Sequence, residues 1–231
     1  MKRKDLEHLI RAAAGVTNEY EFVIVGSQSI LGAVPDAPPE LLMSREADVY
    51  PRNRPDLADL IDGSLGELSS FDDHFGYYAQ GVGPETAKLP DGWEGRLVKV
   101  QNQNTDLKIG YCLEPHDLAA SKLAAARPKD FEFVKTMIKH GLVETDLLCA
   151  RIGTLPLPQA RRTELQGWVK RCHGHGQPTM AKVLAGDDLG AMDSGPTTHE
   201  KSGENSKPGN QKPSEQGGVD TQELLNDDLG R

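Results

Sequence analysis

The stretch from Glu21 to Pro51 constrains the fold and chemistry of this chain more than any other. It opens with an apolar run that ends in the turn Gly26-Ser27, and it closes on a short segment in which Glu46 and Asp48 stand two residues apart. Side chains two residues apart on a strand point to the same face, so both carboxylates would project together. Two such carboxylates repel one another unless a proton or a cation resolves the conflict. The pattern therefore predicts a paired-acid strand close to a turn.

Both parts of this pattern have an ordinary interpretation as well as a functional one. Glycine at a strand end lets the backbone approach a ligand, and N–H groups at a helix start can bind phosphate oxygens. Gly26-Ser27 is otherwise a common strand-to-helix turn, and Glu46 with Asp48 is otherwise a solvated acidic edge. Magnesium takes a few carboxylates together with phosphate oxygens and water. The two parts together favour a magnesium site for a nucleoside triphosphate (NTP), whose β,γ-phosphates the turn would hold.

The remaining patterns predict a mixed α/β front followed by a helical back. Apolar residues recur at helical spacing near the start of the chain, and residues 22–25 form a continuous apolar run suited to a buried strand. Residues 102–104 indicate a hairpin turn, and residues 71–84 are interpreted as a Gly-rich loop bearing aromatic side chains. The expected helices cover residues 4–14, 27–33, 54–61, 115–126, 129–140, 145–152 and 158–171, and the expected strands cover 22–25, 43–50, 96–101 and 106–113.

The end of the chain differs in composition from the rest. Residues 176–231 contain no Phe, Trp or Tyr, and they carry 5 basic and 10 acidic residues, so that 5 − 10 = −5 of the total net charge of −9 lies there. Such a segment cannot bury enough apolar area to offset its ordering entropy. We therefore expect one α/β domain over residues 1–175, with its core in 1–113 and a helical part in 114–175. We expect a disordered acidic tail in 176–231, which could serve a protein partner.

Location and charge narrow the functional classes. No apolar run is long enough to span a membrane, and the three cysteines are too widely spaced for a disulfide framework. We therefore expect a cytoplasmic protein without a membrane partner. The acidic balance argues against broad, non-specific coating of nucleic acid, but it leaves room for a nucleic-acid substrate held at a local basic cleft.

The turn and the acidic pair carry a resemblance to a known superfamily. Val25-Gly26-Ser27 followed by Glu46-Ala-Asp48-Val resembles the nucleotidyltransferase signature, in which a Gly-Gly or Gly-Ser turn precedes an acidic–hydrophobic–acidic strand. More narrowly, residues 44–51 and 75–83 resemble a bacterial nucleotidyltransferase-like family of unassigned function, which is similar to the AbiEii and MenA toxin nucleotidyltransferases. The resemblance covers roughly residues 4–142. It implies a small mixed sheet of nucleotidyltransferase-like topology, backed by a C-terminal helical bundle.

A third stretch, residues 116–130, supports this resemblance. In the relatives it looks like a helix with an inward lysine, then a basic residue, then a Lys-Asp pair that starts the next helix; here these are Lys122, Arg127, Lys129 and Asp130. Lys122 and Arg127 could meet the charge of a triphosphate, and Asp130 could cap free N–H groups at the helix start. The ordinary interpretation of Lys129-Asp130 is a surface salt bridge.

Two features depart from the superfamily pattern. The gap between Gly26-Ser27 and Glu46 is long, because a Pro-rich insertion occupies residues 35–39. The usual third carboxylate has Asp106 as its best-placed candidate, where it would complete a metal shell, although a solvated turn residue fits Asp106 at least as well. Tyr77, Tyr78 and Gln80 are expected in a Gly-flanked loop that could stack on a base or ribose, or the two tyrosines could pack at the edge of the core.

The resemblance implies a transferase that depends on Mg²⁺ and uses an NTP as substrate. It would move a nucleoside monophosphate to an acceptor hydroxyl of RNA, tRNA or a protein, in a toxin–antitoxin or phage-defence setting. Glu46 and Asp48 would bind the metal, which neutralises the triphosphate and lowers the pKa of the acceptor hydroxyl. The alternative is a catalytically degenerate binding module with the same fold, acting as a nucleotide sensor or an antitoxin-like partner.

Overall fold

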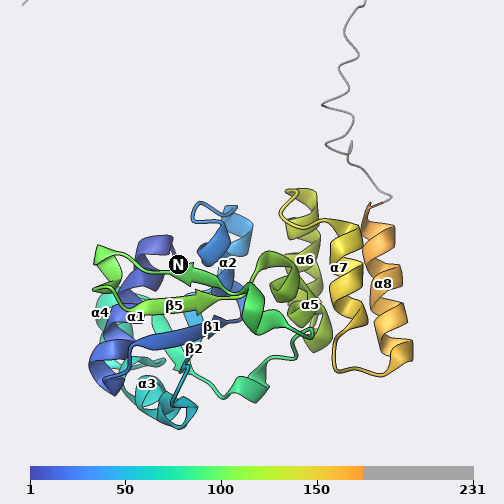
Figure 1. Cartoon of the computed structure of the whole chain (residues 1–231). Coiled ribbons are helices and arrows are strands. Elements are labelled where there is room, and N and C mark those ends of the chain that lie inside the picture. Colours follow the sequence, from blue (N-terminus) through green and yellow to red (C-terminus); the bar gives the residue numbers. More distant parts are fainter. Residues whose placement is uncertain (174–231) are drawn as a thin grey trace, which may run out of the picture. The chain divides into compact units, whose positions relative to one another are not determined.

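The computed structural model describes residues 1–173, and within them five strands form one mixed sheet (Figure 1). The strands are β1 (Glu21–Val25), β2 (Glu46–Pro51), β3 (Tyr78–Gly81), β4 (Val98–Val100) and β5 (Ile109–Cys112), in the order β3-β2-β1-β5-β4. β1 runs antiparallel to β2 and parallel to β5, β2 runs parallel to β3, and β4 runs antiparallel to β5. The α/β fold class expected from the sequence is confirmed.

One face of this sheet is packed against helices α1 (Arg3–Thr17), α2 (Ile30–Ala33) and α3 (Ala58–Leu65). Helix α1 lies close to the sheet at Gly110, which has no side chain. A Cβ added there would lie 2.4 Å from Cδ1 of Ile10 and 2.9 Å from Cδ1 of Ile24. Ile24 pairs with Val49 across the sheet, so Val49 points toward the helices as well. Because side chains alternate along a strand, Asp48 points to the opposite face.

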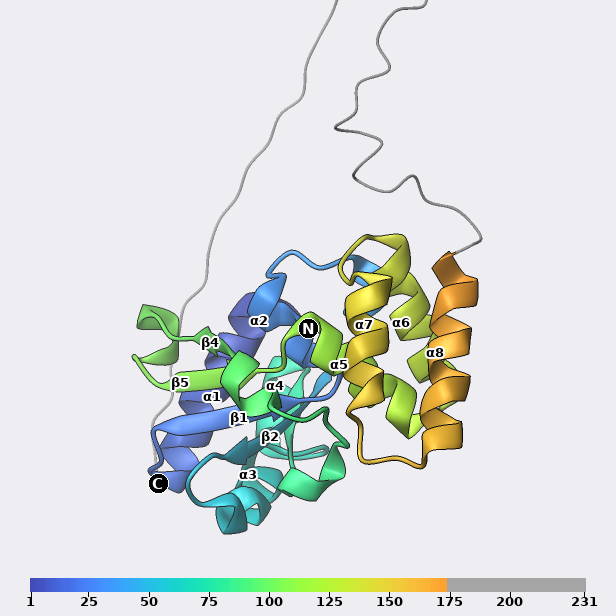
Figure 2. The ribbon, with the colours of Figure 1, turned by 45° about the vertical axis from the view of Figure 1, so that its right-hand side comes forward.

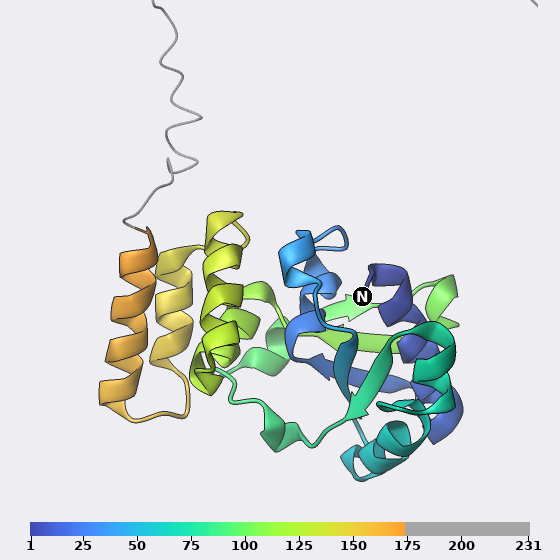
Figure 3. The same cartoon turned by 180° about the vertical axis from the view of Figure 1, so that it is seen from behind.

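The helical part of the chain lies beside one end of the sheet. Helices α5 (Pro115–Ala125), α6 (Pro128–Lys139), α7 (Thr145–Gly153) and α8 (Gln159–His173) stand side by side there (Figures 1 and 3), and β1 and β5 both run toward them (Figure 2). α5 starts two residues after β5 because Pro115 suits a first helical turn and Glu114 caps it. The Glu114 carboxylate accepts hydrogen bonds from the backbone N–H groups of His116 and Asp117, at 3.0 and 3.3 Å.

A buried ion cluster fixes α5 against its neighbours. The carboxylate of Asp117 is fully buried, and Arg96 donates to both of its oxygens at 2.8 and 3.0 Å. Arg151 of α7 pairs with the same carboxylate at 3.3 Å. A buried carboxylate destabilises the folded state unless it is paired, so removal of either arginine would lower the free energy of unfolding. The cluster therefore holds α5 in one position relative to the sheet and to α7.

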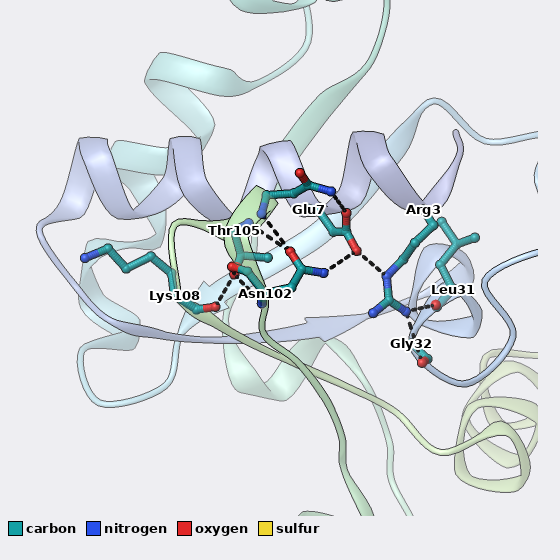
Figure 4. A network of polar contacts seen from close by, with 8 residues as sticks. Arg3, Glu7, Leu31, Gly32, Asn102, Thr105 and Lys108 are labelled. Carbon is teal, nitrogen blue, oxygen red and sulfur yellow. Dashed lines mark hydrogen bonds and ion pairs between the residues drawn. The ribbon is translucent and has the colours of Figure 1, made fainter.

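A second polar network ties α1 to the turn between β4 and β5 (Figure 4). Glu7 is buried on α1, and its carboxylate accepts hydrogen bonds from Asn102 and Asn104 at 2.8 and 2.9 Å and from Arg3 at 2.9 Å. Arg3 also donates to the carbonyl oxygens of Leu31 and Gly32 at the end of α2. Burial alone would raise the pKa of Glu7, but these hydrogen bonds and the charge of Arg3 outweigh it, so the pKa is lowered.

Most of the expected elements are present, and one segment differs from the expectation. The hairpin expected around residues 102–104 is formed by β4 and β5, and the four expected helices beyond residue 114 correspond to α5–α8. Residues 71–84 were expected to be a loop, but they contain most of helix α4 (Ser70–Phe75) and the whole of strand β3. The expected tail, 176–231, lies outside the described residues. Of the helices in residues 1–173, none has the length and apolar character that crossing a bilayer requires.

Candidate active site

A cavity of about 1210 Å³ opens where β1 and β2 face the helices α5 and α6. Its walls come from the end of β1, the acid face of β2, the segment 40–44, β3 with the residues that follow it, and helices α5 and α6. Small-molecule pockets usually measure about 300–1,000 Å³, so this cavity is large enough for a ligand of that kind. Eight of the residues proposed from the sequence line it, namely Gly26, Ser27, Glu46, Asp48, Lys122, Arg127, Lys129 and Asp130.

Gly26 and Asp48 are in direct contact at the floor of the cavity. Gly26 has a φ of 67° and a ψ of −166°, a conformation open essentially to glycine alone. A Cβ added at this position would lie 1.8 Å from Oδ2 of Asp48. The register explains this contact, because Val25 is the cross-strand partner of Asp48 and Gly26 is the next residue. The turn and the acidic strand, widely separated in sequence, therefore form one surface.

Glu46 and Asp48 form a carboxylate pair on this surface, on the same face of β2. The pKa of Asp48 is raised to about 6, first by burial and then by the charge and hydrogen bond of Glu46, against the opposing charges of Lys122 and Arg127. The pair thus holds a proton at mildly acidic pH, which relieves the repulsion of two adjacent negative charges. A cation between the carboxylates would relieve the same repulsion at neutral pH.

This donor set suits a divalent cation of the magnesium type. Carboxylate oxygens are hard ligands, and the close approach of Gly26 leaves no side chain between the turn and Asp48. Within residues 1–173 no group of three or more His, Cys, Asp or Glu side chains is placed to hold a metal. Glu46 and Asp48 would therefore supply the two protein ligands, and phosphate oxygens and water would supply the rest.

The wall on the α5 and α6 side is cationic. Lys122 is only 8% exposed, and its Nζ lies 3.4 Å from Oδ1 of Asp130 and 5.4 Å from the ring centre of Phe133. Arg127 donates to both oxygens of Asp130, at 2.7 and 3.2 Å. Burial lowers the pKa of Lys122, and the charge of Asp130 offsets only part of this effect. The wall therefore presents two cations held by one carboxylate.

Asp130 is a structural anchor for this wall. It is 1% exposed, and it also accepts a hydrogen bond from the backbone N–H of Arg127 at 3.2 Å, which caps the start of α6. Burial alone would raise the pKa of Asp130, but the Arg127 hydrogen bond and the two positive charges outweigh it, so the pKa is lowered. The carboxylate is therefore ionised at neutral pH, and it fixes Lys122 and Arg127 in place. The expected capping role agrees with this geometry.

Two side chains proposed from the sequence lie away from the cavity. Asp106 is exposed and precedes β5, whereas the cavity lies beyond the other end of the parallel strand β1. Tyr77 bonds to Nδ1 of His8 at 2.8 Å and packs its ring against Phe71 and Phe75. The structure therefore brings neither residue to the paired acids. Asp106 is an exposed turn residue, and Tyr77 packs among aromatic side chains outside the cavity.

The sequence pointed to Tyr78 and Gln80 as loop residues, but it missed that they belong to strand β3. Strand β3 lies in register with β2, so that Tyr78 is beside Glu46 and Gln80 is beside Asp48. Gln80 lines the cavity, and the Tyr78 hydroxyl donates to Oε2 of Glu46 at 3.2 Å. The pKa of Tyr78 is raised to about 12 by burial and by the charge of Glu46. The alternation of Tyr78 and Gln80 around Ala79 was the available signal, but the flanking glycines indicated a loop.

Comparison with known proteins gives one result. The model of the family described as "Nucleotidyltransferase of unknown function" (DUF6036) matches residues 3–164, which is more than half of the chain. The matched region contains the whole cavity and every residue of its two charged walls. No curated protein and no solved structure matches the chain.

Proposed function

The chain belongs to this family of nucleotidyltransferases of unknown function, and on that basis we propose that its cavity transfers a nucleoside monophosphate from an NTP to an acceptor hydroxyl in the presence of Mg²⁺. The observation that carries the proposal is the contact between Gly26 and Asp48. It places the paired acids of β2 and the turn after β1 on one surface, opposite the cations of α5 and α6.

Glu46 and Asp48 are the residues that would hold magnesium. When bound, Mg²⁺ neutralises triphosphate charge and lowers the pKa of the attacking hydroxyl. The two carboxylates would set where the reacting phosphate binds, since magnesium takes phosphate oxygens beside a few carboxylates. Burial of Asp48 keeps this place partly free of water, which strengthens its electrostatic interactions.

Lys122 and Arg127 would balance the charge that develops on the leaving pyrophosphate. Both are held by Asp130, so their positive charges are already in place before the substrate arrives. Such preorganised charge stabilises a transition state without a reorganisation cost. Lys129 is exposed at the cavity edge next to them and would meet phosphate oxygens from solution.

Gly26 and Ser27 would receive the β,γ-phosphates. Glycine has no side chain to keep a ligand away from the backbone. A side chain at position 26 would in addition collide with Asp48. Ser27 lines the cavity, and within the described part of the chain no residue takes its Oγ as a hydrogen-bond partner. Its hydroxyl is therefore available to a phosphate oxygen.

The acceptor and the biological setting follow from the resemblance to the AbiEii and MenA toxins. We include in the proposal an acceptor hydroxyl on RNA, tRNA or a protein, and a role in a toxin–antitoxin or phage-defence system. Each acceptor class would give a labelled product of its own size, so one labelling experiment distinguishes them.

The test uses α-³²P-labelled NTPs with the full-length protein, Mg²⁺, and either total RNA or total protein as acceptor. Incorporation is expected with the wild type and is expected to be absent with Glu46→Ala combined with Asp48→Ala. Asp106→Asn is the matched control, because it removes a carboxylate that lies away from the cavity, and it should label as well as the wild type. Equal labelling by the wild type and the double variant would refute the catalytic assignment.

A second candidate is a catalytically degenerate binding module. It is favoured by one observation. Strand β2 brings only two carboxylates to the cavity, and within residues 1–173 no group of three or more His, Cys, Asp or Glu side chains is placed to hold a metal. Such a module would sense a nucleotide or bind a partner protein. It predicts that an NTP with Mg²⁺ raises the melting temperature of the wild type, while no NTP labels any acceptor.

A further inference from the structure

Strand β3 lies beside the acid pair and is built to support it. β2 and β3 are parallel and in register, with Glu46 opposite Tyr78. Cross-strand partners project to the same face of a sheet, so the Tyr78 side chain lies on the face that carries the two acids. Tyr78 Oη donates to Oε2 of Glu46 at 3.2 Å.

The backbone of Tyr78 is held to the residue that precedes β2. Its backbone N–H donates to the carbonyl oxygen of Arg45 at 3.0 Å, which joins the start of β3 to β2. The Arg45 guanidinium donates to both oxygens of Asp72, at 2.8 and 3.2 Å, and Asp72 is a buried residue of α4. The phenol therefore bonds to Glu46 from a strand whose first residue is hydrogen-bonded to Arg45, and Arg45 is itself fixed by Asp72.

The backbone of Glu46 is fixed as well, so the remaining freedom lies in its side chain. Glu46 N–H donates to Oγ of Ser44 at 3.1 Å, and Gln28 donates from its side chain to the carbonyl oxygen of Ser44 at 3.1 Å. A glutamate side chain has three rotatable torsions, and a hydrogen bond to one carboxylate oxygen restricts them.

We propose that Tyr78 is a positioning residue for the cation site: its hydroxyl holds Oε2 of Glu46, so that Oε1 stays available to the cation beside the carboxylate of Asp48. This inference rests on the proposed function, because it assumes that Glu46 and Asp48 bind a divalent cation. Partners that hydrogen-bond to a metal-binding carboxylate set its orientation, and their removal typically weakens metal binding about 10- to 100-fold.

The test compares Tyr78→Phe with Tyr77→Phe in the full chain. Both changes remove one phenol hydroxyl and one side-chain hydrogen bond from neighbouring positions, but the hydroxyl of Tyr77 bonds to His8 outside the cavity. Binding of Mn²⁺ alone is measured by the loss of the free-ion signal in electron paramagnetic resonance, and Glu46→Gln reports whether the ion occupies this site. Circular dichroism and melting temperature show that each variant is folded.

Tyr78→Phe should weaken Mn²⁺ binding about tenfold, while Tyr77→Phe binds as the wild type does. In the labelling assay, the Mg²⁺ concentration for half-maximal rate should rise by a similar factor, with little change in kcat at saturating Mg²⁺. Wild-type affinity in Tyr78→Phe would overturn the inference and leave the proposed function standing. An equal loss in both tyrosine variants would overturn it as well, because the effect would then be general. Absence of Mn²⁺ binding by the wild type would overturn both this inference and the metal-dependent function.

Discussion

Oδ2 of Asp48 occupies the space that a side chain at position 26 would need, since a Cβ on Gly26 would lie 1.8 Å from it. Gly26→Ala should therefore displace the Asp48 carboxylate and strain a backbone with a φ of 67°. We expect a loss of about 1–3 kcal/mol in the free energy of unfolding and a fall of about 100-fold in labelling activity. Urea denaturation and the labelling assay measure the two effects.

Gly76→Ala is the control for this variant. Gly76 also has a positive φ, 73°, but nothing lies within 4 Å of the position that its Cβ would take. It should lose some stability and keep its activity per folded molecule. If both alanine variants lost activity equally, the contact between Gly26 and Asp48 would have no special role.

The raised pKa of Asp48 predicts how stability depends on pH and on metal. Its pKa is about 6 in the folded protein, against an ordinary value of 3.8 for aspartate, so the folded state binds more protons between these two pH values. Stability from this group is therefore present at low pH and is lost as the pH rises toward 6. In EDTA at pH 7.5, Asp48→Asn should be more stable than the wild type by on the order of 1–2 kcal/mol.

Two further measurements test the same charge. At pH 4 the difference between Asp48→Asn and the wild type should shrink, because Asp48 of the folded wild type is then protonated. Mg²⁺ at pH 7.5 should raise the melting temperature of the wild type and leave that of Asp48→Asn nearly unchanged. A wild type that gains no stability from Mg²⁺ at any pH would contradict the assignment of a cation site to this pair.

Lys122→Met removes one positive charge from the cationic wall and keeps most of the side-chain volume. Methionine fills a similar volume, and Asp130 keeps its bidentate partner Arg127, so the variant should fold. Loss of one preorganised charge should lower kcat/KM for the NTP about 10²- to 10³-fold. Lys135→Gln removes an exposed charge from α6 outside the cavity and should leave kcat/KM within a factor of two or so. Similar values for the two variants would remove Lys122 from the mechanism.

Glu7→Gln should destabilise the protein in a manner that depends on pH. In the folded protein the pKa of Glu7 lies below its ordinary value of 4.5. The stability that ionised Glu7 contributes is therefore present above pH 4.5, and it is lost as the pH falls through the pKa of the folded state. We expect a loss of about 1–3 kcal/mol at pH 7, with a smaller difference at pH 3.5, measured by urea denaturation. Glu164→Gln, an exposed carboxylate on α8, is the control and should change stability little.

The acid pair shows how far local pattern alone can lead. The two-residue spacing of Glu46 and Asp48 correctly indicated a shared face, because alternation is a property of any strand. The proximity of Gly26 to Asp48 results from the antiparallel pairing of β1 and β2. This pairing could not be predicted from the local sequence pattern. Lys122 and Asp130 came from a resemblance rather than from periodicity, and the structure places both beside the cavity.

The errors have equally specific physical reasons. Asp106 was placed near the acids because a hairpin was expected, but a hairpin pattern does not say which end of it approaches the cavity. Since β5 runs parallel to β1, the residues before β5 lie at the opposite end from Gly26. β3 was missed because it is a four-residue edge strand between Gly76 and Gly83, where glycine spacing outweighed alternation. Tertiary pairing with β2, rather than local propensity, makes it a strand.

The long interval between Gly26 and Glu46 also has a structural meaning. Residues 39–41 form a 3-10 turn that packs against α6, and Glu40 and Leu41 face the cavity. The stretch that follows the proline-rich insertion is thus one wall of the cavity. Deleting residues 39–41 would remove this wall and expose the cationic side of the cavity to bulk solvent.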